Sequence, residues 1–346
     1  MTDSRWARSP RIVEAMRRAA ELAERVRGST SPNPPVGCVI LDEAGSVVGT
    51  GATRPPGGPH AEVVALREAG SAARGGTAVV TLEPCAHVGR TGSCAVALRE
   101  AGVARVVHAV DDPNPSAAGG AEELANSGVA VAGGVLAEEV SAGALRGWLR
   151  FVRNGRPHVT WKYAASLDGR SAAVDGTSQW ISSPESRAEV HRLRAGCDAV
   201  LAGTGTVQAD DPRLTVRDES GVPLRRQPLR VVLGDRELPA GARVFDDSAE
   251  TLRLRGRDPG EALRVLAERG VVEVFLEGGP TLAGAFLRAG VIDRVQAFVA
   301  PALLGSGRSA LGEAGVVSLS QAWRFYFERV TMCGPDVWIS AVPMEG

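Results

Sequence analysis

The sequence predicts an α/β protein with two domains. Its 346 residues are enough for two separate hydrophobic cores, and 44% of them are hydrophobic. Runs rich in β-formers alternate with helical patterns along the chain, which is typical of sheets covered by helices. Asn154-Gly155 and Pro157 interrupt a helical segment before strand-like patterning begins afresh. We therefore place the boundary in this region and expect domains 1–150 and 151–346.

The expected elements follow one another regularly within each half. After an amphipathic first helix, a Pro-rich turn leads into two β-rich runs, which residues 42–45 join as a hairpin. The first half then predicts helices at 61–70 and 95–101 and strands at 77–84, 104–113 and 129–135. The second half predicts helices at 184–196, 260–270 and 280–290, and strands at 197–207, 228–235, 251–256, 271–279 and 293–301.

One stretch of the first half carries an ordered set of metal-binding and acid/base groups. Glu62 follows His60 by two residues, and Cys85 and Cys94 come after them. Zinc deaminases hold their metal with one His and two Cys, and a Glu two residues after the His moves protons without binding the metal. Zinc lowers the pKa of its bound water to about 7, which supplies hydroxide at neutral pH. The pattern predicts a zinc deaminase site with ligands His60, Cys85 and Cys94 and with Glu62 as the catalytic residue.

Other interpretations of the same residues are open. Each residue taken alone could be structural, as a surface histidine or as a cysteine packed like a small hydrophobe. Eight residues separate Cys85 from Cys94, whereas the general deaminase pattern has two. His87 lies in that longer segment and is a competing ligand, although one His and two Cys already complete a catalytic set. Asn33 lies between two prolines that restrict its backbone, so its amide either binds a pyrimidine edge or belongs to a simple turn.

Composition narrows the partners and the compartment. Lys and Arg total 39 against 40 Asp and Glu, so there is no broad basic field and we expect no nucleic-acid partner. No apolar run approaches the roughly 18 residues of a membrane span, so we expect no membrane partner. Five cysteines, an odd number, fit metal binding in a reducing, cytoplasmic setting better than a disulfide framework. Cys38, Cys197 and Cys333 lie in or beside apolar runs and are expected to be structural.

The second half has no G-x-G-x-x-G sequence opening a helix, so the usual dinucleotide fingerprint is missing. Residues 277–281 nonetheless end an apolar strand and open a helix. Backbone N–H groups left unpaired at such a turn can bind a phosphate. The same Gly-Gly-Pro sequence also serves as an ordinary connection between a strand and a helix, and both interpretations stay open.

Longer motifs extend the comparison to nearly the whole chain. They are PNPPVGCVI, PHAEVVAL, TLEPCAHVGRTGSC, DDPNP, KYAASLDGR, SQWISS, GTGTVQADDPRLTVR and EGGPTLAGAFL. In these motifs the chain resembles the bifunctional deaminase/reductases of riboflavin biosynthesis. The resemblance implies an N-terminal cytidine-deaminase-like three-layer domain followed by a dihydrofolate-reductase-like α/β domain. It also implies zinc and NADPH as cofactors, and a phosphoribosylamino-pyrimidine substrate that is first deaminated and then reduced at its ribosyl group.

The resemblance further implies which residues contact the substrate and NADPH. Substrate contacts would be Asn33, Lys162, Ser178, Arg194, Leu214, Arg217 and Glu277, and the two arginines would suit bidentate phosphate binding. Cofactor contacts would be Ala164, Trp180, Thr206, Asp210, Gly279, Pro280, Thr281, Leu282, Ala283, Gly284 and Ala285. Without the resemblance, Arg194 is one charge among several on a helix face. We also expect a homo-oligomer.

Two other functions are open at the level of the sequence. A related deaminase/reductase acting on another pyrimidine would keep Glu62 and alter the reductase contacts. A protein that binds pyrimidine nucleotides without turnover would have no need to retain the chemical groups of both sites. All of those groups are present in this chain.

Overall fold

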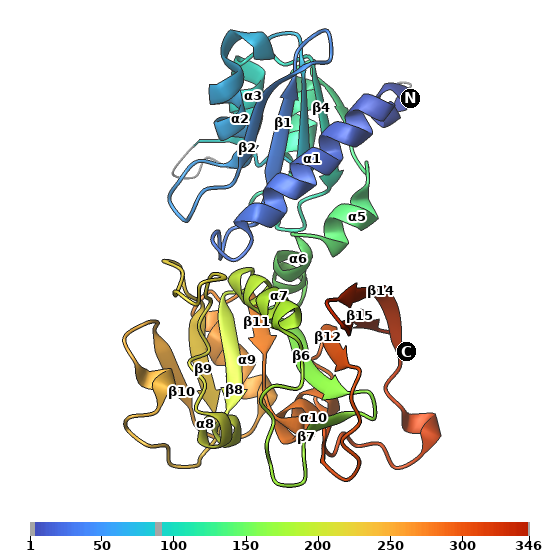
Figure 1. The fold of residues 1–346 in the computed structure, drawn as a ribbon. Helices are drawn as coiled ribbons and strands as arrows, with labels where there is room; N and C mark the ends of the chain where they lie inside the picture. Colours follow the sequence, from blue (N-terminus) through green and yellow to red (C-terminus); the bar gives the residue numbers. More distant parts are fainter. Residues whose placement is uncertain (1–3, 87–91, 345–346) are drawn as a thin grey trace. The chain divides into compact units, whose positions relative to one another are not determined.

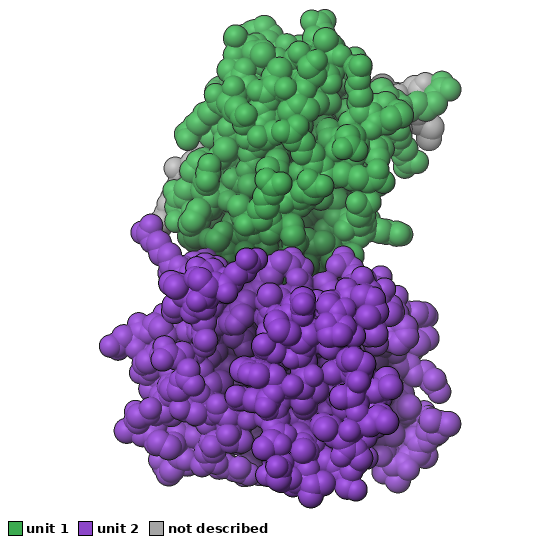
Figure 2. Space-filling model, viewed as in Figure 1, with its two compact units in different colours: residues 1–155 green, residues 156–346 purple. Residues whose placement is uncertain are grey.

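The computed structural model describes residues 4–86 and 92–344, so His87 lies outside the described residues. The chain divides into two compact units, Met1–Gly155 and Arg156–Gly346 (Figure 2). The last helix of the first unit, α6 (Arg146–Asn154), ends at Gly155, which has a positive φ of 68°. Glycine adopts this left-handed conformation readily, so the Asn-Gly pair ends the helix as its composition predicts.

The first unit contains a five-stranded sheet (Figure 1). Its strand order is β2-β1-β3-β4-β5, with β1 antiparallel to β2 and β3, and with β3, β4 and β5 parallel. The strands are β1 (Gly37–Leu41), β2 (Val47–Ala52), β3 (Thr77–Leu82), β4 (Arg105–Val110) and β5 (Ala130–Ala132). The helices besides α6 are α1 (Pro10–Val26), α2 (Ala61–Ala69), α3 (Cys94–Glu100), α4 (Gly120–Asn126) and α5 (Ala137–Ala142), with 3-10 turns at Ser4–Arg8 and Gly70–Ala73.

Glycines allow two helices to approach this sheet closely from opposite faces. A Cβ added to Gly37 in β1 would lie 1.9 Å from the Ala19 carbonyl oxygen of α1. Gly51 in β2 pairs with Cys38, the residue after Gly37, and its added Cβ would lie 2.1 Å from the Ala61 carbonyl oxygen of α2. Successive residues of a strand point to opposite faces of the sheet. Helices α1 and α2 therefore cover opposite faces, which confirms the predicted three layers.

The second unit is built on an eight-stranded sheet with the order β10-β9-β8-β11-β6-β12-β15-β14. The strands from β10 to β12 are parallel, and β15 and β14 complete the sheet in antiparallel fashion. These strands are β6 (His158–Ser166), β8 (Ala199–Gly203), β9 (Leu229–Leu233), β10 (Thr251–Leu254), β11 (Glu273–Leu276), β12 (Arg294–Ala300), β14 (Phe325–Cys333) and β15 (Asp336–Pro343), while β7 (Arg170–Ala172) pairs with β13 (Arg308–Ser309). The helices are α7 (Pro184–Ala195), α8 (Thr204–Asp210), α9 (Pro259–Glu268) and α10 (Pro280–Arg288), with 3-10 turns at Arg243–Phe245 and Leu319–Gln321.

The central strands of this sheet are buried on both faces. Leu201 in β8 belongs to the core that contains Phe286 of α10, whereas its neighbour Val200 belongs to the core that contains Val190 of α7. Burial on both faces is typical of parallel sheets, because their crossover helices cover both sides. The α/β class predicted for this half is confirmed.

One predicted strand is partly wrong. The strand expected at 197–207 ends at Gly203, and Thr204–Asp210 forms α8 instead. Thr and Val are poor helix formers that are enriched in strands, so they favour an extended chain here. Packing overrides that preference, since Val207 is buried in the same core as Val200. The strands β14 and β15 were not predicted.

Candidate active sites

The three predicted zinc ligands converge in the first unit. His60 is the N-cap of α2, Cys85 follows β3, and Cys94 is the first residue of α3. Their ligand atoms all lie within 4.8 Å of one another, with His60 Nδ1 3.2 Å from Cys94 Sγ and 3.6 Å from Cys85 Sγ. A tetrahedral zinc ion with ordinary Zn–N and Zn–S bond lengths places such atoms about 3.6 Å apart. The spacing and the donor types fit zinc.

Hydrogen bonds fasten the two cysteines to each other. Cys94 N–H donates to Cys85 Sγ at 3.4 Å, and the Ser93 hydroxyl donates to the Cys85 carbonyl at 2.9 Å. A hydrogen bond from the Cys94 thiol lowers the pKa of Cys85 to about 4, and the same shared proton, together with burial, raises the pKa of Cys94. Thiolate is the form that binds a metal. Zinc binding would therefore displace the proton that the two cysteines share.

Glu62 lies in the first turn of α2, two residues after the histidine ligand. Its side chain is buried, and this burial raises the pKa of Glu62 to about 7. Glu62 also interacts with the Cys94 thiol, which places it beside the ligands, yet it is not one of the three clustered ligand groups. A carboxyl group with a pKa near neutrality suits general acid/base catalysis.

A buried carboxylate that sequence reasoning missed organises the loops around this site. Glu83 directly follows β3, two residues before Cys85, and its Oε1 accepts hydrogen bonds from the N–H groups of Gly119 and Ala121, each at 3.1 Å. Its Oε2 accepts from Asp112 N–H at 3.1 Å. Glu83 thereby ties the segment after β4 to the metal-ligand loop. Glu83 lies in the TLEPC motif and Asp112 lies in DDPNP. These two motifs are the sequence signal that could have indicated this role.

Asn33 lies in a turn near the start of β1. Its N–H donates to the Thr30 carbonyl at 2.9 Å, and its own carbonyl accepts from the Thr30 hydroxyl at 3.0 Å. The residue is half-buried. Within residues 4–86 and 92–344, no hydrogen bond joins the Asn33 amide to the zinc ligands.

In the second unit, three of the predicted substrate contacts form one charged cluster. Arg194 from α7 forms a bidentate ion pair with Glu277, which directly follows β11, and its Nη2 donates to Glu277 Oε2 at 2.8 Å. Lys162 Nζ in β6 lies 4.0 Å from Glu277 Oε2. Burial raises the pKa of Glu277, but the charge and hydrogen bond of Arg194, together with the charge of Lys162, outweigh that effect and leave the pKa below its ordinary value. Burial also lowers the pKa of Lys162.

Arg217 lies beside this cluster and has no carboxylate partner in the described part of the chain. Its Nε donates to the Thr215 hydroxyl at 3.1 Å, and its backbone N–H donates to His191 Nδ1 at 3.2 Å. Burial and then the charges of Arg194, Arg213 and other arginines lower the pKa of Arg217. Positive charge therefore accumulates around Arg217, which is where a bound anion would be stabilised.

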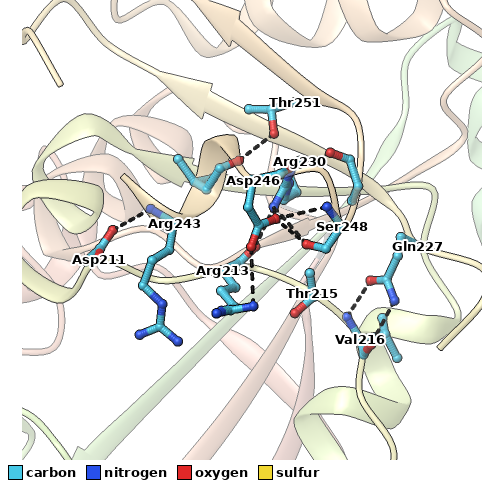
Figure 3. A network of polar contacts seen from close by, with 12 residues as sticks. Asp211, Arg213, Thr215, Val216, Gln227, Arg230, Arg243, Asp246, Ser248 and Thr251 are labelled. Atoms are coloured by element: carbon cyan, nitrogen blue, oxygen red, sulfur yellow. Dashed lines mark hydrogen bonds and ion pairs between the residues drawn. The ribbon is translucent and has the colours of Figure 1, made fainter. Parts of the chain in front are cut away.

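The segment that carries Leu214 and Arg217 is held by a polar network that the sequence did not reveal (Figure 3). Arg230 in β9 is fully buried, and its Nη1 donates to Asp246 Oδ1 at 2.8 Å and to the Arg213 carbonyl at 3.3 Å. The Gln227 side chain binds both the N–H and the carbonyl of Val216, at 2.7 and 2.8 Å. Leu214 is buried with a positive φ of 53°, a strained conformation that this network supports. The sequence signal that could have indicated this network is Arg230 itself, a charged residue within the apolar sequence of β9.

The predicted cofactor contacts fall into smaller groups. Gly279 N–H donates to the Thr206 hydroxyl at 3.1 Å, which joins the first turn of α8 to the turn before α10. The Ser178 hydroxyl donates to Asp210 Oδ1 at 3.1 Å. In the run from Gly279 to Ala285, Ala283 and Gly284 are buried, and a Cβ on Gly284 would lie 2.0 Å from the Glu313 carbonyl oxygen.

Among the described residues, no hydrogen bond or ion pair joins Ala164 or Trp180 to these groups. Ala164 packs against the core that contains Val190. The Trp180 ring is 68% exposed and lies under the Arg187 guanidinium, 4.5 Å from it. An exposed aromatic ring of this kind remains accessible to a ligand.

Comparison of the sequence with known proteins identifies the family to which the chain belongs. Residues 10–110 match the cytidine and deoxycytidylate deaminase zinc-binding region, and residues 157–339 match the RibD C-terminal domain. The riboflavin biosynthesis protein RibD of Mycobacterium tuberculosis is 55% identical over 96% of this chain and 97% of its own length. The chain belongs to the RibD family. RibD of Escherichia coli is 42% identical over 94% of this chain and 98% of its own length.

Solved RibD structures share the fold over the full length. Acinetobacter baumannii RibD superposes with a TM-score of 0.87 at 38% identity and covers 97% of this chain and 99% of its own. A Thermotoga maritima protein described as a diaminohydroxyphosphoribosylaminopyrimidine deaminase and 5-amino-6-(5-phosphoribosylamino)uracil reductase gives 0.88 at 34% identity, covering 96% and 98% of the two chains. The chain is therefore a bifunctional enzyme of riboflavin biosynthesis, with a zinc-dependent deaminase and an NADPH-dependent reductase.

Proposed function

We propose that residues 1–150 deaminate a diaminohydroxyphosphoribosylaminopyrimidine and that residues 151–346 reduce the ribosyl group of the product to ribityl. The observation that supports this proposal best is the convergence of His60, Cys85 and Cys94 beside the buried Glu62. A hydrolytic deaminase needs such a ligand set together with a proton carrier. The substrate itself is the one named for the Thermotoga relative, whose chain aligns along nearly its whole length.

In the deaminase site, His60, Cys85 and Cys94 would hold zinc, and Glu62 would move the protons. Zinc, when bound, acts as a Lewis acid and makes water nucleophilic at neutral pH. Glu62 has a pKa of about 7, so its carboxylate can accept a proton from the attacking water and its acid form can return one. The returned protons go to the ring nitrogen and to the departing ammonia. The Asn33 amide would bind the pyrimidine edge.

In the reductase site, the charged cluster would hold the substrate. Arg194 keeps Glu277 ionised, so Glu277 can accept hydrogen bonds from ribosyl hydroxyls while the nearby Lys162 donates to the substrate. Because Arg194 is committed to Glu277, Arg217 would make the main contact with the terminal phosphate. Ser178 and the backbone of Leu214 complete the proposed substrate contacts.

NADPH would bind where the turns around Thr206 and Gly279 meet, and it supplies the hydride. The Thr206–Gly279 hydrogen bond holds this turn, and the exposed Thr281 in the first turn of α10 would offer its backbone N–H to a diphosphate. Since Ala283 and Gly284 are buried, their part would be to shape the turn closely against the neighbouring chain. Ala164, Trp180, Asp210 and Ala285 would surround the rest of the cofactor.

An assay with two independent signals tests this proposal. Purified protein that is given the diaminopyrimidine ribosyl phosphate without NADPH should release ammonia and accumulate the deaminated product, which is not reduced. Addition of NADPH should start its oxidation, since the deaminated product is present by then. Stripping zinc with a chelator should abolish ammonia release yet leave NADPH oxidation on separately supplied deaminated substrate. NADPH oxidation before any ammonia release would contradict the order of the two steps.

The homo-oligomer expected from the sequence would form through β14. This strand lies at the edge of the eight-stranded sheet, and it exposes four large apolar side chains, Tyr326, Phe327, Val330 and Met332. An apolar edge strand is prone to pair with another copy of itself unless it is covered. Molar mass from light scattering during size-exclusion chromatography tests this part of the proposal.

We also propose that the protein is located in the cytoplasm. No helix among the described residues is both long and apolar enough to cross a bilayer. The five cysteines are free, and the two proposed zinc thiols need a reducing environment to remain so. These thiols support a place in the cytoplasm, which fractionation of cells followed by immunodetection would test.

A further inference from the structure

Two side chains of α7 hold the segment that carries Arg217. Arg194 Nη1 donates to the Thr215 carbonyl at 2.9 Å, and the Arg217 N–H donates to His191 Nδ1 at 3.2 Å. His191 and Arg194 are three residues apart in a helix, so they lie on the same face of α7. Both bonds fasten residues 215–217 to that face.

The middle residue of this segment is bonded to a different part of the chain. The Gln227 side chain binds the N–H and the carbonyl of Val216 (Figure 3), and the same carbonyl accepts from Leu224 N–H at 3.0 Å. Val216 is thereby anchored without α7, whereas the Arg217 N–H has the His191 ring as its acceptor. A change of the His191 side chain therefore alters the support of Arg217 and leaves that of Val216 in place.

The His191 ring can play this part only when it is neutral. A ring nitrogen that accepts a hydrogen bond carries no proton, so the proton of His191 lies on Nε2. Burial, followed by the charges of Arg194 and Arg217, lowers the pKa of His191 to about 4. The ring therefore stays neutral at the pH of an enzyme assay and adds no charge to the positive surroundings of Arg217.

The side chain of Arg217 is tied at its base and open at its tip. Its Nε donates to the Thr215 hydroxyl at 3.1 Å, while within residues 4–86 and 92–344 no hydrogen bond or ion pair uses its Nη groups. The two contacts, one to the backbone and one to Nε, fix where the guanidinium starts and how it turns. A guanidinium held in this way loses less freedom when it meets a phosphate.

We infer that His191 is a positioning residue for substrate binding: its Nδ1 holds the Arg217 backbone so that the guanidinium meets the terminal phosphate. The inference rests on the phosphate contact proposed above for Arg217. His191 acts through Arg217 and does not touch the substrate. Its loss therefore weakens substrate binding and leaves the hydride step as fast as before.

Three substitutions at one position test which ring nitrogen matters. The side-chain oxygen of Asn lies about where Nδ1 lies in His, and the amide of the longer Gln reaches about as far as Nε2, whereas Leu offers neither group. His191→Leu should raise the KM for the deaminated, phosphorylated substrate about three- to tenfold, the usual effect of one neutral hydrogen bond. Its kcat and its KM for NADPH should change less than about twofold. His191→Asn should restore the KM for the substrate, and His191→Gln should not.

The opposite results are equally clear. Rescue by Gln and not by Asn would mean that Nε2 contacts the substrate directly, and the positioning role would be wrong. Wild-type KM values in all three variants would also overturn it. A parallel loss of kcat and of NADPH affinity would show that His191 serves only the fold. Arg192→Leu changes an exposed neighbour on the same helix and should leave the KM for the substrate unchanged.

A double variant separates this inference from the proposed phosphate contact. If His191 acts through Arg217, His191→Leu should add nothing to the KM of Arg217→Ala, as a double-mutant cycle requires. Additive losses would mean that the two residues act independently and would overturn the inference. If Arg217→Ala has no effect on the KM, the proposed phosphate contact is wrong. If Arg217→Ala weakens binding and His191→Leu does not, the contact stands and only the role of His191 fails.

Discussion

Arg217→Ala is the most informative change in the reductase unit. The guanidinium is half-buried, donates to the Thr215 hydroxyl and has no carboxylate partner within the described residues. Its neighbours are positive, since Arg194 and Arg213 contribute to lowering its pKa. Removal of Arg217 therefore leaves no buried carboxylate unpaired and relieves repulsion in the free enzyme. The effect on substrate binding should appear without a loss of fold.

The magnitude follows from one charged contact with a phosphate. A hydrogen bond to a charged group contributes about 1.5–3 kcal/mol, and about 1.4 kcal/mol corresponds to a factor of ten. Arg217→Ala should weaken binding of the deaminated substrate roughly ten- to hundredfold. NADPH affinity should hardly change, because the proposed cofactor contacts lie on other turns.

The assay compares the natural substrate with its dephosphorylated analogue. Substrate KM is measured from NADPH oxidation, and direct binding is measured by calorimetry, for wild type and variant. If Arg217 contacts the phosphate, the analogue is already poor for wild type and loses little more in the variant, as a double-mutant cycle requires. Equal losses with both compounds would refute the phosphate contact and assign Arg217 to another group or to the fold.

Three further changes probe the other parts of the account. Cys85→Ser should lower the zinc content measured by mass spectrometry well below one equivalent, while Cys197→Ser, a buried cysteine of the other unit, should keep it; normal zinc in Cys85→Ser would exclude this ligand. Burial and the charges of Arg194 and Arg217 lower the pKa of His191 from 6.5 to about 4. Between pH 6.5 and 4 the unfolded chain therefore binds a proton at His191 that the folded chain does not bind, so stability should fall as the pH drops over this range. The melting temperature of His191→Gln should fall less than that of wild type over the same range. Parallel curves of melting temperature against pH for the two proteins would contradict this. Phe327→Glu places a charge on the exposed face of β14 and should lower the molar mass in solution, and an unchanged mass would exclude β14 as the interface.

The sequence predicted the fold where local pattern and packing agree. The hairpin at 42–45 and the buried strands of the first unit followed from residue patterning and turn residues, whereas its three layers were implied by the resemblance. Local pattern failed at α8, where Thr and Val favour an extended chain and the burial of Val207 favours the helix instead. It also missed β14, because an edge strand with exposed apolar residues has no buried face to create an alternating pattern.

The sites were predictable to the extent that their residues follow motifs. His60, Glu62, Cys85 and Cys94 were expected to meet because the zinc deaminase pattern specifies their order, and the three ligands do converge. The ion pair between Arg194 and Glu277 joins α7 to the end of β11, and no local spacing encodes such a contact. The buried Arg230 and Glu83 likewise act through partners that only the folded chain brings near.

One measurement tests the central claim most directly, and it uses Glu62→Gln. The variant should retain zinc, because Glu62 is not among the clustered ligands, and should lose ammonia release by about 10²–10⁴-fold, because the proton carrier is gone. Given deaminated substrate, the same protein should oxidise NADPH at nearly the wild-type rate, since the reductase residues belong to the other unit. Ammonia release and NADPH oxidation are followed in parallel, with zinc content determined on the same sample. Undiminished ammonia release in zinc-loaded Glu62→Gln, or loss of both activities in a folded protein, would contradict the account.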